Sequence, residues 1–146
     1  MVIIAVVNPA EYMPGIRKML EDNWAETGLN FEFNPDVEMY SRAHATGMLF
    51  AVAAIDGDEV VGYCTVAMMP HQHNPNIVFA GNDALFVAPA HRNSLVPGRL
   101  IKTAEREAKR RGAQRFSWHC RAGTPLADSL VRHGYTPVDI VVMKEL

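Results

Sequence analysis

The sequence has little of what disulfide-rich or membrane proteins need. Its 146 residues include only two cysteines, Cys64 and Cys120, and no CxxC motif. Two cysteines are too few for a disulfide framework, so we expect a reducing, cytoplasmic compartment. The apolar run at residues 2–7 is too short to cross a membrane, and no basic segment precedes it as in a signal peptide. We therefore interpret this run as a buried strand and expect no membrane partner.

A strong excess of one charge is also missing. The net charge is −2, with 49% hydrophobic and 21% charged residues, which indicates a single globular domain over residues 1–146. A slightly negative chain is poorly suited to nucleic acid, because phosphate contacts need clustered Lys and Arg on the binding face. Nothing in the composition fixes the oligomeric state, and a homodimer stays open.

The charges are nevertheless unevenly distributed. Residues 1–47 hold seven acidic and three basic side chains, whereas residues 98–115 hold seven basic and two acidic ones. One part of the chain could attract a cation and the other an anion. Solvated helix faces of opposite sign are the alternative, and the sequence alone leaves both open.

Hydrophobic periodicity and turn residues predict an α/β fold without internal repeats. Asn34 and Pro35 mark a helix start, and residues 70–76 are predicted to form a loop. The predicted strands are 2–7, 48–55, 60–69, 77–87 (bent near Gly81), 115–120 and 135–144, and the predicted helices are 9–26, 35–46, 98–111 and 124–133. This β-α-α-β-β-β-α-β-α-β order predicts a central mixed sheet with helices on both faces.

The connection between the strand at residues 85–87 and the helix from Gly98 is the most informative segment. Arg92, Asn93 and Ser94 lie in this loop, immediately before a basic helix. The first N–H groups of a helix lack intrahelical acceptors and carry partial positive charge, so a polar turn there can hold an anion such as a phosphate. An ordinary strand-to-helix connection that holds no ligand is the alternative.

The same segment resembles the GNAT superfamily of acyl-CoA N-acyltransferases, and the short chain is similar to its small phage-type members. Val87, Pro89 and Arg92 match the family motif V-x-P-x-x-R-x-x-G-x-G/A, and residues 108–112 match the basic end of the helix that follows it. Ala127 and the pair at residues 134–135 match a later Ala-(x)6-Gly-Phe/Tyr element. The resemblance covers residues 48–146 well and the two N-terminal helices more loosely.

The resemblance implies an N-acetyltransferase that uses acetyl-CoA as its donor. In this family an amine attacks the thioester carbonyl directly, and a backbone N–H on the central strand, here near Phe86 or Val87, holds the developing oxyanion. The pantetheine arm pairs with the exposed strand edge like an added strand. The residues expected to bind the cofactor are Leu85, Phe86, Val87, Arg92, Asn93, Ser94, Leu95, Gly98 and Arg99.

Three positions depart from the family pattern. Leu95 and Pro97 stand where the motif has two glycines, and Pro97 removes one N–H donor from the expected cradle. Ser94 could contribute a hydroxyl instead. Leu130 occupies the place where many members carry a tyrosine that protonates the departing thiolate, although a thiolate needs little acid help near neutral pH.

The resemblance also suggests which residues do the chemistry. Some members place a catalytic base four residues before the motif valine, which is Asp83 here. Regular alternation puts Asp83 on the face of Leu85 and Val87, among apolar neighbours that favour a neutral carboxylic acid. A carboxylate that only caps a turn is the alternative interpretation. His119, with Trp118, is expected at the mouth of the acceptor site and is the second candidate, although a structural histidine is the more common case.

Two classes of function follow. The first is direct transfer of acetyl from acetyl-CoA to a small amine or a protein amino group, with the acidic N-terminal helices (Glu26, Glu32, Asp36 and Glu38) facing a cationic acceptor. The second is an acyl-CoA-binding or protein-interaction module that keeps the fold without turnover, which the departures at Leu95, Pro97 and Leu130 motivate. A metal is not expected, because the His71–His73 pair lacks a third ligand.

Overall fold

A five-stranded sheet of order β1-β2-β3-β4-β5 forms the centre of the protein, whose residues 1–146 are all described by a computed structural model. The first four strands are antiparallel to their neighbours, and β5 runs parallel to β4. The strands are β1 (Val2–Val7), β2 (Leu49–Asp56), β3 (Glu59–His71), β4 (Asn74–Val87) and β5 (Arg115–Ser117). The predicted mixed α/β fold is therefore confirmed, with one strand fewer than expected.

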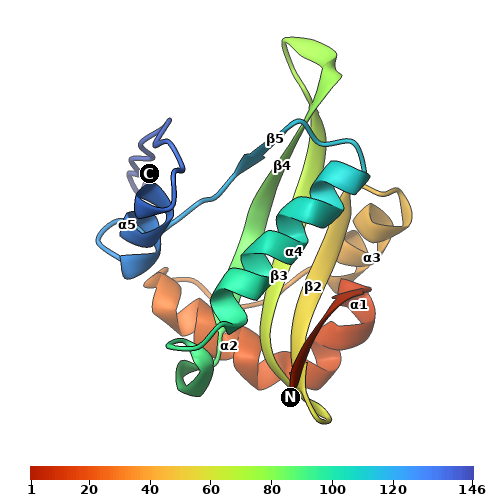
Figure 1. Ribbon diagram of the computed structural model, residues 1–146, viewed down its shortest axis with the longest axis vertical. Coiled ribbons are helices and arrows are strands. Elements are labelled where there is room, and N and C mark those ends of the chain that lie inside the picture. The colour runs from red at the N-terminus through yellow and green to blue at the C-terminus, as the bar shows by residue number, and fades with distance from the viewer.

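Helices cover both faces of this sheet (Figure 1). On one face lies α4 (Val96–Arg110), whose Leu100, Ala104 and Ala108 are buried against β2, β3 and β4 in the main hydrophobic core. The other face carries the N-terminal helices α1 (Pro9–Tyr12), η1 (Met13–Ile16), α2 (Arg17–Thr27) and α3 (Val37–Ala45). No helix is long and apolar enough to cross a membrane.

A close approach between α4 and β3 fixes the first of these layers. A Cβ added to Gly62 would lie 3.1 Å from Leu100 Cδ1, 3.1 Å from the Phe86 carbonyl oxygen and 3.3 Å from Val87 Cγ2. A side chain at residue 62 would push these neighbours outward by a few tenths of an ångström, so glycine permits this close packing of helix and sheet. The N-terminus of α4 is therefore held directly over the end of β4.

The N-terminal helices differ from their predicted bounds. The helix expected over residues 9–26 is interrupted by η1, because Pro14 lacks the N–H that would continue the i→i−4 ladder. The helix expected from Pro35 starts at Val37, because Asp36 is the N-cap and its Oδ1 accepts a hydrogen bond from the Met39 N–H at 2.9 Å.

The hairpin between β3 and β4 is longer than predicted and contains two irregularities. Residues 70–76, expected to be a loop, belong mostly to the two strands, and pairing continues to His71 and Asn74 after a register shift at Pro70. A second shift opposite Thr65 and Val66 leaves Asp83 without a paired partner. The strand bends by a β-bulge at Asp83, two residues beyond the predicted position at Gly81.

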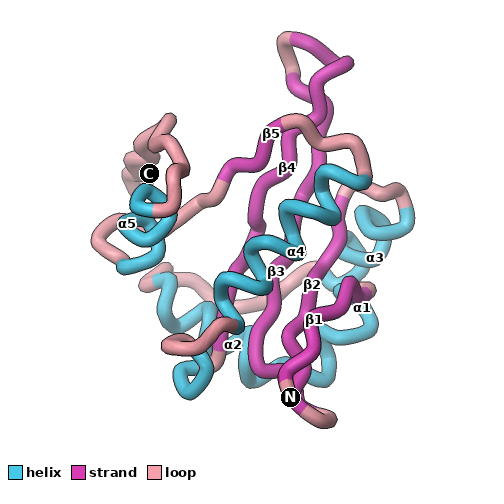
Figure 2. Tube along the Cα trace, in the orientation of Figure 1, coloured by secondary structure: helices cyan, strands magenta, loops and turns pink.

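The C-terminal third also departs from expectation. The helix predicted from Gly98 already begins at Val96, since proline is tolerated at the start of a helix, and β5 ends at Ser117 instead of Cys120. After α5 (Pro125–Arg132), the strand predicted over 135–144 is absent, and residues 136–146 form no regular structure (Figure 2). No strand of the sheet pairs with this segment, and its apolar side chains Val138, Ile140, Val141, Val142 and Met143 are exposed.

Candidate functional site

The site begins where β4 and β5 separate. The two strands pair only between residues 79–81 and 115–117. At this separation, which we call the fork, the Asn82 side chain takes the place of the β4–β5 backbone pairing. Its Nδ2 donates to the His119 carbonyl at 3.2 Å and its Oδ1 accepts from the His119 N–H at 2.6 Å. Because the chain after β5 is held by Asn82 rather than by further pairing, β4 continues beyond this fork without a partner on that side.

The free edge of β4 runs from the fork to Val87. The Ala88 N–H donates to the Val61 carbonyl at 2.8 Å, so alternate residues of β4 face β3, and Leu85 and Val87 between them direct their backbone groups to the open edge. Arg92 Nε donates to the Val87 carbonyl at 2.7 Å on that edge. The remaining edge groups are positioned to receive an extended ligand as an added strand.

Unused backbone donors lie directly beyond this edge. The N–H groups of Asn93, Ser94, Leu95 and Gly98 donate to no acceptor within the protein. The Ser94 hydroxyl is not available in the predicted way, because it donates to the His91 carbonyl at 2.6 Å and accepts from the Val96 N–H at 3.1 Å. These two bonds shape the turn and leave the four amides for an anion at the N-terminus of α4.

The two residues that replace the motif glycines do not close this turn. The Leu95 side chain is 81% exposed. Pro97 lies in the first turn of α4, where the missing N–H would have had no intrahelical acceptor. A Cβ added to Gly98 would meet nothing within 4 Å. The protein therefore has no steric need of its own for glycine at residue 98, and the space above it is open.

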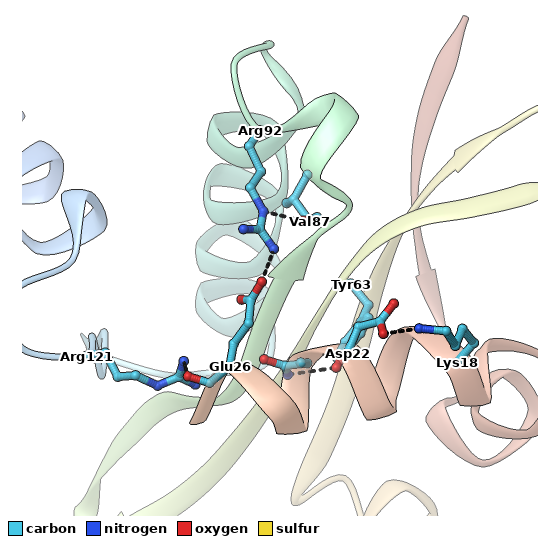
Figure 3. A network of polar contacts seen from close by, with 8 residues as sticks. Lys18, Asp22, Glu26, Tyr63, Val87, Arg92 and Arg121 are labelled. Carbon is cyan, nitrogen blue, oxygen red and sulfur yellow. Dashed lines mark hydrogen bonds and ion pairs between the residues drawn. The ribbon is translucent and has the colours of Figure 1, made fainter. Parts of the chain in front are cut away.

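Arg92 joins the loop to the end of α2. Its guanidinium lies 5.1 Å from the Phe86 ring centroid, and one of its nitrogens is 2.6 Å from Glu26 Oε1. Arg121, from the chain after β5, donates to the Glu26 carbonyl (Figure 3). The loop after β4 and the chain after β5 are thus both bonded to Glu26 of α2. Arg92 would have to leave this ion pair to bind a phosphate.

A cavity of 320 Å³ lies between the sheet and the N-terminal helices. Its wall comes from the end of β1, from α1, η1, α2, α3 and the connection between α2 and α3, and from the faces of β2, β3 and β4 that point away from α4. Most lining residues are apolar, with Asp83 as the one charged side chain: Val7, Pro9, Tyr12, Met13, Ile16, Leu20, Asn23, Trp24, Thr27, Leu29, Phe33, Pro35, Tyr40, Ala51, Ala53, Val60, Tyr63, Thr65, Asp83 and Ala84.

Asp83 stands at the point where this cavity meets the fork. The bulge turns its side chain away from Leu85 and Val87, which pack toward α4, so the expectation that these three share a face is wrong. Asp83 is exposed rather than surrounded by apolar groups, and the Tyr40 hydroxyl donates to its Oδ2 at 2.6 Å. The bulge thus presents a carboxylate to the cavity from the central strand.

Two of the phenols that line the cavity, Tyr40 and Tyr63, interact electrostatically with Asp83. Burial, together with the hydrogen bond to Asp83, raises the pKa of Tyr40, and burial raises the pKa of Tyr63 to about 12. The Asn23 amide donates to the Tyr63 hydroxyl at 2.8 Å. Both tyrosines are therefore neutral at physiological pH and serve as hydrogen-bonding groups.

The acidic residues of the N-terminal helices do not face the cavity, contrary to the expectation from charge. Glu26 pairs with Arg92, Asp36 caps α3, and Glu38 pairs with Arg42 at 2.8 Å. Glu32 is exposed and lies outside the cavity lining. Three of these four carboxylates therefore form ion pairs or a helix cap instead of facing an acceptor.

His119 lies at the fork through its backbone, while its ring is exposed and forms no hydrogen bond within the protein. Trp118 does not line a mouth beside it. It stacks on Phe116 with ring centroids 4.4 Å apart and donates to Glu105 Oε1 at 2.9 Å. The His119 backbone is therefore bonded to Asn82, the residue that precedes Asp83. The Trp118 side chain points toward α4 instead.

Neither cysteine is prepared as a nucleophile. Burial raises the pKa of the Cys64 thiol, which lies in the core, and raises that of the half-buried Cys120. Both therefore stay protonated near neutral pH. No group of three or more His, Cys, Asp or Glu side chains is arranged to hold a metal ion.

The comparison with known families decides the identity. The sequence model described as "Acetyltransferase (GNAT) family" matches residues 16–135, most of the chain. The chain belongs to the GNAT family. As a member it is an N-acetyltransferase, and its β4–β5 fork and bulged β4 lie within the matched residues. No curated protein matches the sequence.

Solved GNAT structures share the fold over nearly their whole length. A ribosomal-protein-alanine N-acetyltransferase from Brucella melitensis biovar Abortus 2308 has a TM-score of 0.73 at 15% identity, with 100% of this chain and 99% of that chain covered. An aminoglycoside acetyltransferase from an uncultured soil metagenomic sample, in complex with sisomicin, has a TM-score of 0.75 at 15% identity, with 99% and 95% covered. AAC(6')-Iy in complex with the bisubstrate analog CoA-S-monomethyl-acetylneamine has a TM-score of 0.75 at 13% identity, with 100% and 98% covered.

Proposed function

We propose that the protein transfers acetyl directly from acetyl-CoA to the neutral amine of an acceptor bound in the 320 Å³ cavity. The observation that carries the proposal is the continuity of three features: unused amides at the start of α4, an unpaired β4 edge, and a carboxylate where that edge meets the cavity. A nucleotide thioester needs the first two, and an amine acceptor needs the third.

On the donor side, the pyrophosphate would lie over the N–H groups of Asn93, Ser94, Leu95 and Gly98. The pantetheine amides would pair with the free edge groups of Leu85 and Val87. The Phe86 ring, on the same strand, lies 6.2 Å from the ring of the cavity residue Tyr63. Arg99 lies in the first turns of α4, where its guanidinium donates to the Val2 carbonyl at 2.8 Å. This path delivers the thioester carbonyl to the fork beside Asp83.

On the acceptor side, Asp83 would attract the ammonium group and accept the proton that it loses. A lysine-like amine has a pKa of about 10.4, so most of it is protonated at neutral pH and a base is useful. The amine nitrogen then attacks the thioester carbon, and the C–S bond breaks as the tetrahedral intermediate collapses. A backbone N–H at the open edge of β4 stabilises the oxyanion. His119 is the second candidate for proton transfer.

The proposal is tested by measuring two products in one reaction. Acetyl-CoA and an amine should yield free CoA thiol and acetylated amine in equal amounts, with the acetylated product identified by mass spectrometry. Binding of acetyl-CoA without thiol release across primary, secondary and peptide amines would instead indicate a binding module. Absence of acetyl-CoA binding would refute the donor site itself.

Variants separate the two sides of the site. Asp83→Asn should lower kcat at neutral pH by about a hundredfold to ten-thousandfold and leave acetyl-CoA affinity unchanged. His119→Gln tests the second candidate, because it removes the exposed ring and retains the backbone contact to Asn82; an unchanged kcat would exclude His119 from proton transfer. Arg92→Ala should raise the KM for acetyl-CoA, and an unaltered KM would remove Arg92 from the cradle.

A further inference from the structure

The charge of the cavity lining limits which acceptors the cavity can receive. Of its 20 lining residues, 14 are hydrophobic and only Asp83 carries a charge. An acceptor with several ammonium groups would leave all but one of them unpaired against apolar walls, which is costly. A single cation, by contrast, is matched by the single carboxylate.

We infer, on the basis of the proposed function, that the acceptor is a compact primary monoamine with an apolar, ring-sized body. Its ammonium group binds Asp83 at the fork, and its body fills the space between the sheet and α2. This class differs from the polycationic aminoglycosides named for two of the structural neighbours.

One oxygen of the Asp83 carboxylate is free to accept a hydrogen bond from the acceptor. Asp83 Oδ2 accepts the Tyr40 hydroxyl at 2.6 Å, while Oδ1 accepts no hydrogen bond within the protein. Tyr40 therefore holds the orientation of the carboxylate, and a single N–H donor of the acceptor is sufficient to satisfy it. Neutral Tyr63 adds a hydroxyl to the same wall.

The size of the cavity sets the size of the body. A volume of 320 Å³ lies at the lower end of the range of about 300–1,000 Å³ that is typical of small-molecule sites. It has room for a phenyl ring with a short alkyl arm. A multi-ring aminoglycoside or a peptide segment would extend beyond it.

Aromatic side chains line the side opposite Asp83's strand. The Trp24 ring contacts Phe31 edge-on with centroids 4.9 Å apart and lies 5.8 Å from the Phe33 ring. The indole N–H donates to the Phe31 carbonyl at 3.2 Å, and Arg17 lies over Phe33 at 5.0 Å. These contacts hold Trp24 and Phe33 in place before a ligand arrives, so an apolar body is received by a preformed surface.

The inference is tested with three acceptors: 2-phenylethylamine, spermidine and neamine. Burial of the ring predicts a kcat/KM for 2-phenylethylamine that is about tenfold to a hundredfold above that for either polycation. A higher kcat/KM for spermidine or neamine overturns the inference and leaves the proposed function standing. Failure of all three to be acetylated, with acetyl-CoA bound, counts against the proposed function.

Calorimetric measurement of acceptor affinity without acetyl-CoA distinguishes failure of this inference from failure of the proposed function. In the absence of acetyl-CoA, 2-phenylethylamine should bind the wild-type protein more tightly than spermidine does. Equal or inverted affinities overturn the inference whatever the transfer assay gives.

A variant at Leu29, which is 36% exposed on the cavity wall, tests the same inference by adding a second negative charge. Leu29→Asp should shift preference toward spermidine by about tenfold, whereas Val138→Asp, on the exposed C-terminal segment, should leave the preference unchanged. An unshifted preference in Leu29→Asp also overturns it.

Discussion

The Asn82 side chain and the His119 backbone form a reciprocal pair of hydrogen bonds, at 3.2 Å and 2.6 Å, that ends the pairing of β4 with β5. An amide side chain presents one donor and one acceptor, as a backbone unit does, so it can stand in for one rung of the ladder. The fork thus has a fixed starting point, set by a single side chain.

Asn82→Ala should lower the free energy of unfolding by about 1–2 kcal/mol, the value of two partly exposed hydrogen bonds. It should also raise the KM for acetyl-CoA, because the arm that begins at His119 loses its attachment to β4. Thermal unfolding and initial-rate kinetics measure the two effects. Asn76→Ala, in the exposed hairpin, is the matched control and should change neither.

Glu26→Ala should tighten acetyl-CoA binding by about twofold to fivefold. The exposed ion pair between Glu26 and Arg92 holds the guanidinium away from the α4 amides, and such pairs contribute about 0.2–1 kcal/mol. Titration calorimetry measures the change. Glu21→Ala, which removes a different α2 ion pair with Arg17, should have no effect. Weaker binding in Glu26→Ala would mean that Glu26 positions Arg92 for the phosphate.

Gly98→Ala should separate stability from donor binding. The new methyl group meets no protein atom within 4 Å, and alanine is favoured over glycine in a helix by about 0.5–1 kcal/mol, so the melting temperature should rise. The same methyl would stand over the amides proposed to hold the pyrophosphate, so affinity for CoA should fall. A variant that gains stability and keeps its CoA affinity would move the phosphate away from Gly98.

Stability should depend on acid through Glu107. Hydrogen bonds from Arg110, and secondarily from Arg111, lower the pKa of this carboxyl to about 2, and Arg111 in turn lies 4.7 Å from the centroid of the core residue Phe50. A folded-state pKa below the unfolded value of about 4.3 means that this stabilisation is complete above that pH and is lost as pH falls toward 2. Denaturant titrations of wild type and Glu107→Gln should therefore converge between about pH 5 and 2. A constant difference over that range would exclude the linkage.

Much of the fold follows from patterns that are local in sequence. The β2–β3 hairpin has its turn at Gly57, and α4 has its apolar stripe, so both could be predicted. Gly81 indicated a bend in β4, but the position of the bulge at Asp83 could not be predicted, because one extra residue reverses the face that the neighbouring side chains occupy. Predicting that Asp83 neighbours Leu85 and Val87 failed for this reason alone.

The site was only partly accessible from sequence because its contacts are long-range. Tyr40 meets Asp83 across 43 residues and Asn23 meets Tyr63 across 40, and neither pair has a spacing signal. Asn82 stands beside the predicted base, yet its role depends on where β5 ends. The turn residues 92–98 were identifiable because a strand, a polar loop and a basic helix are adjacent in the chain.

We propose that the open edge of β4 and the amides before α4 hold the CoA donor. Titration of CoA into ¹⁵N-labelled protein tests it directly, because each proposed donor is a backbone N–H with its own NMR signal. We expect the largest shift changes at Leu85, Val87, Asn93–Leu95 and Gly98, with the hairpin tip around Gln72 unaffected. Saturable binding that leaves these amides unmoved, or no binding at all, would contradict it.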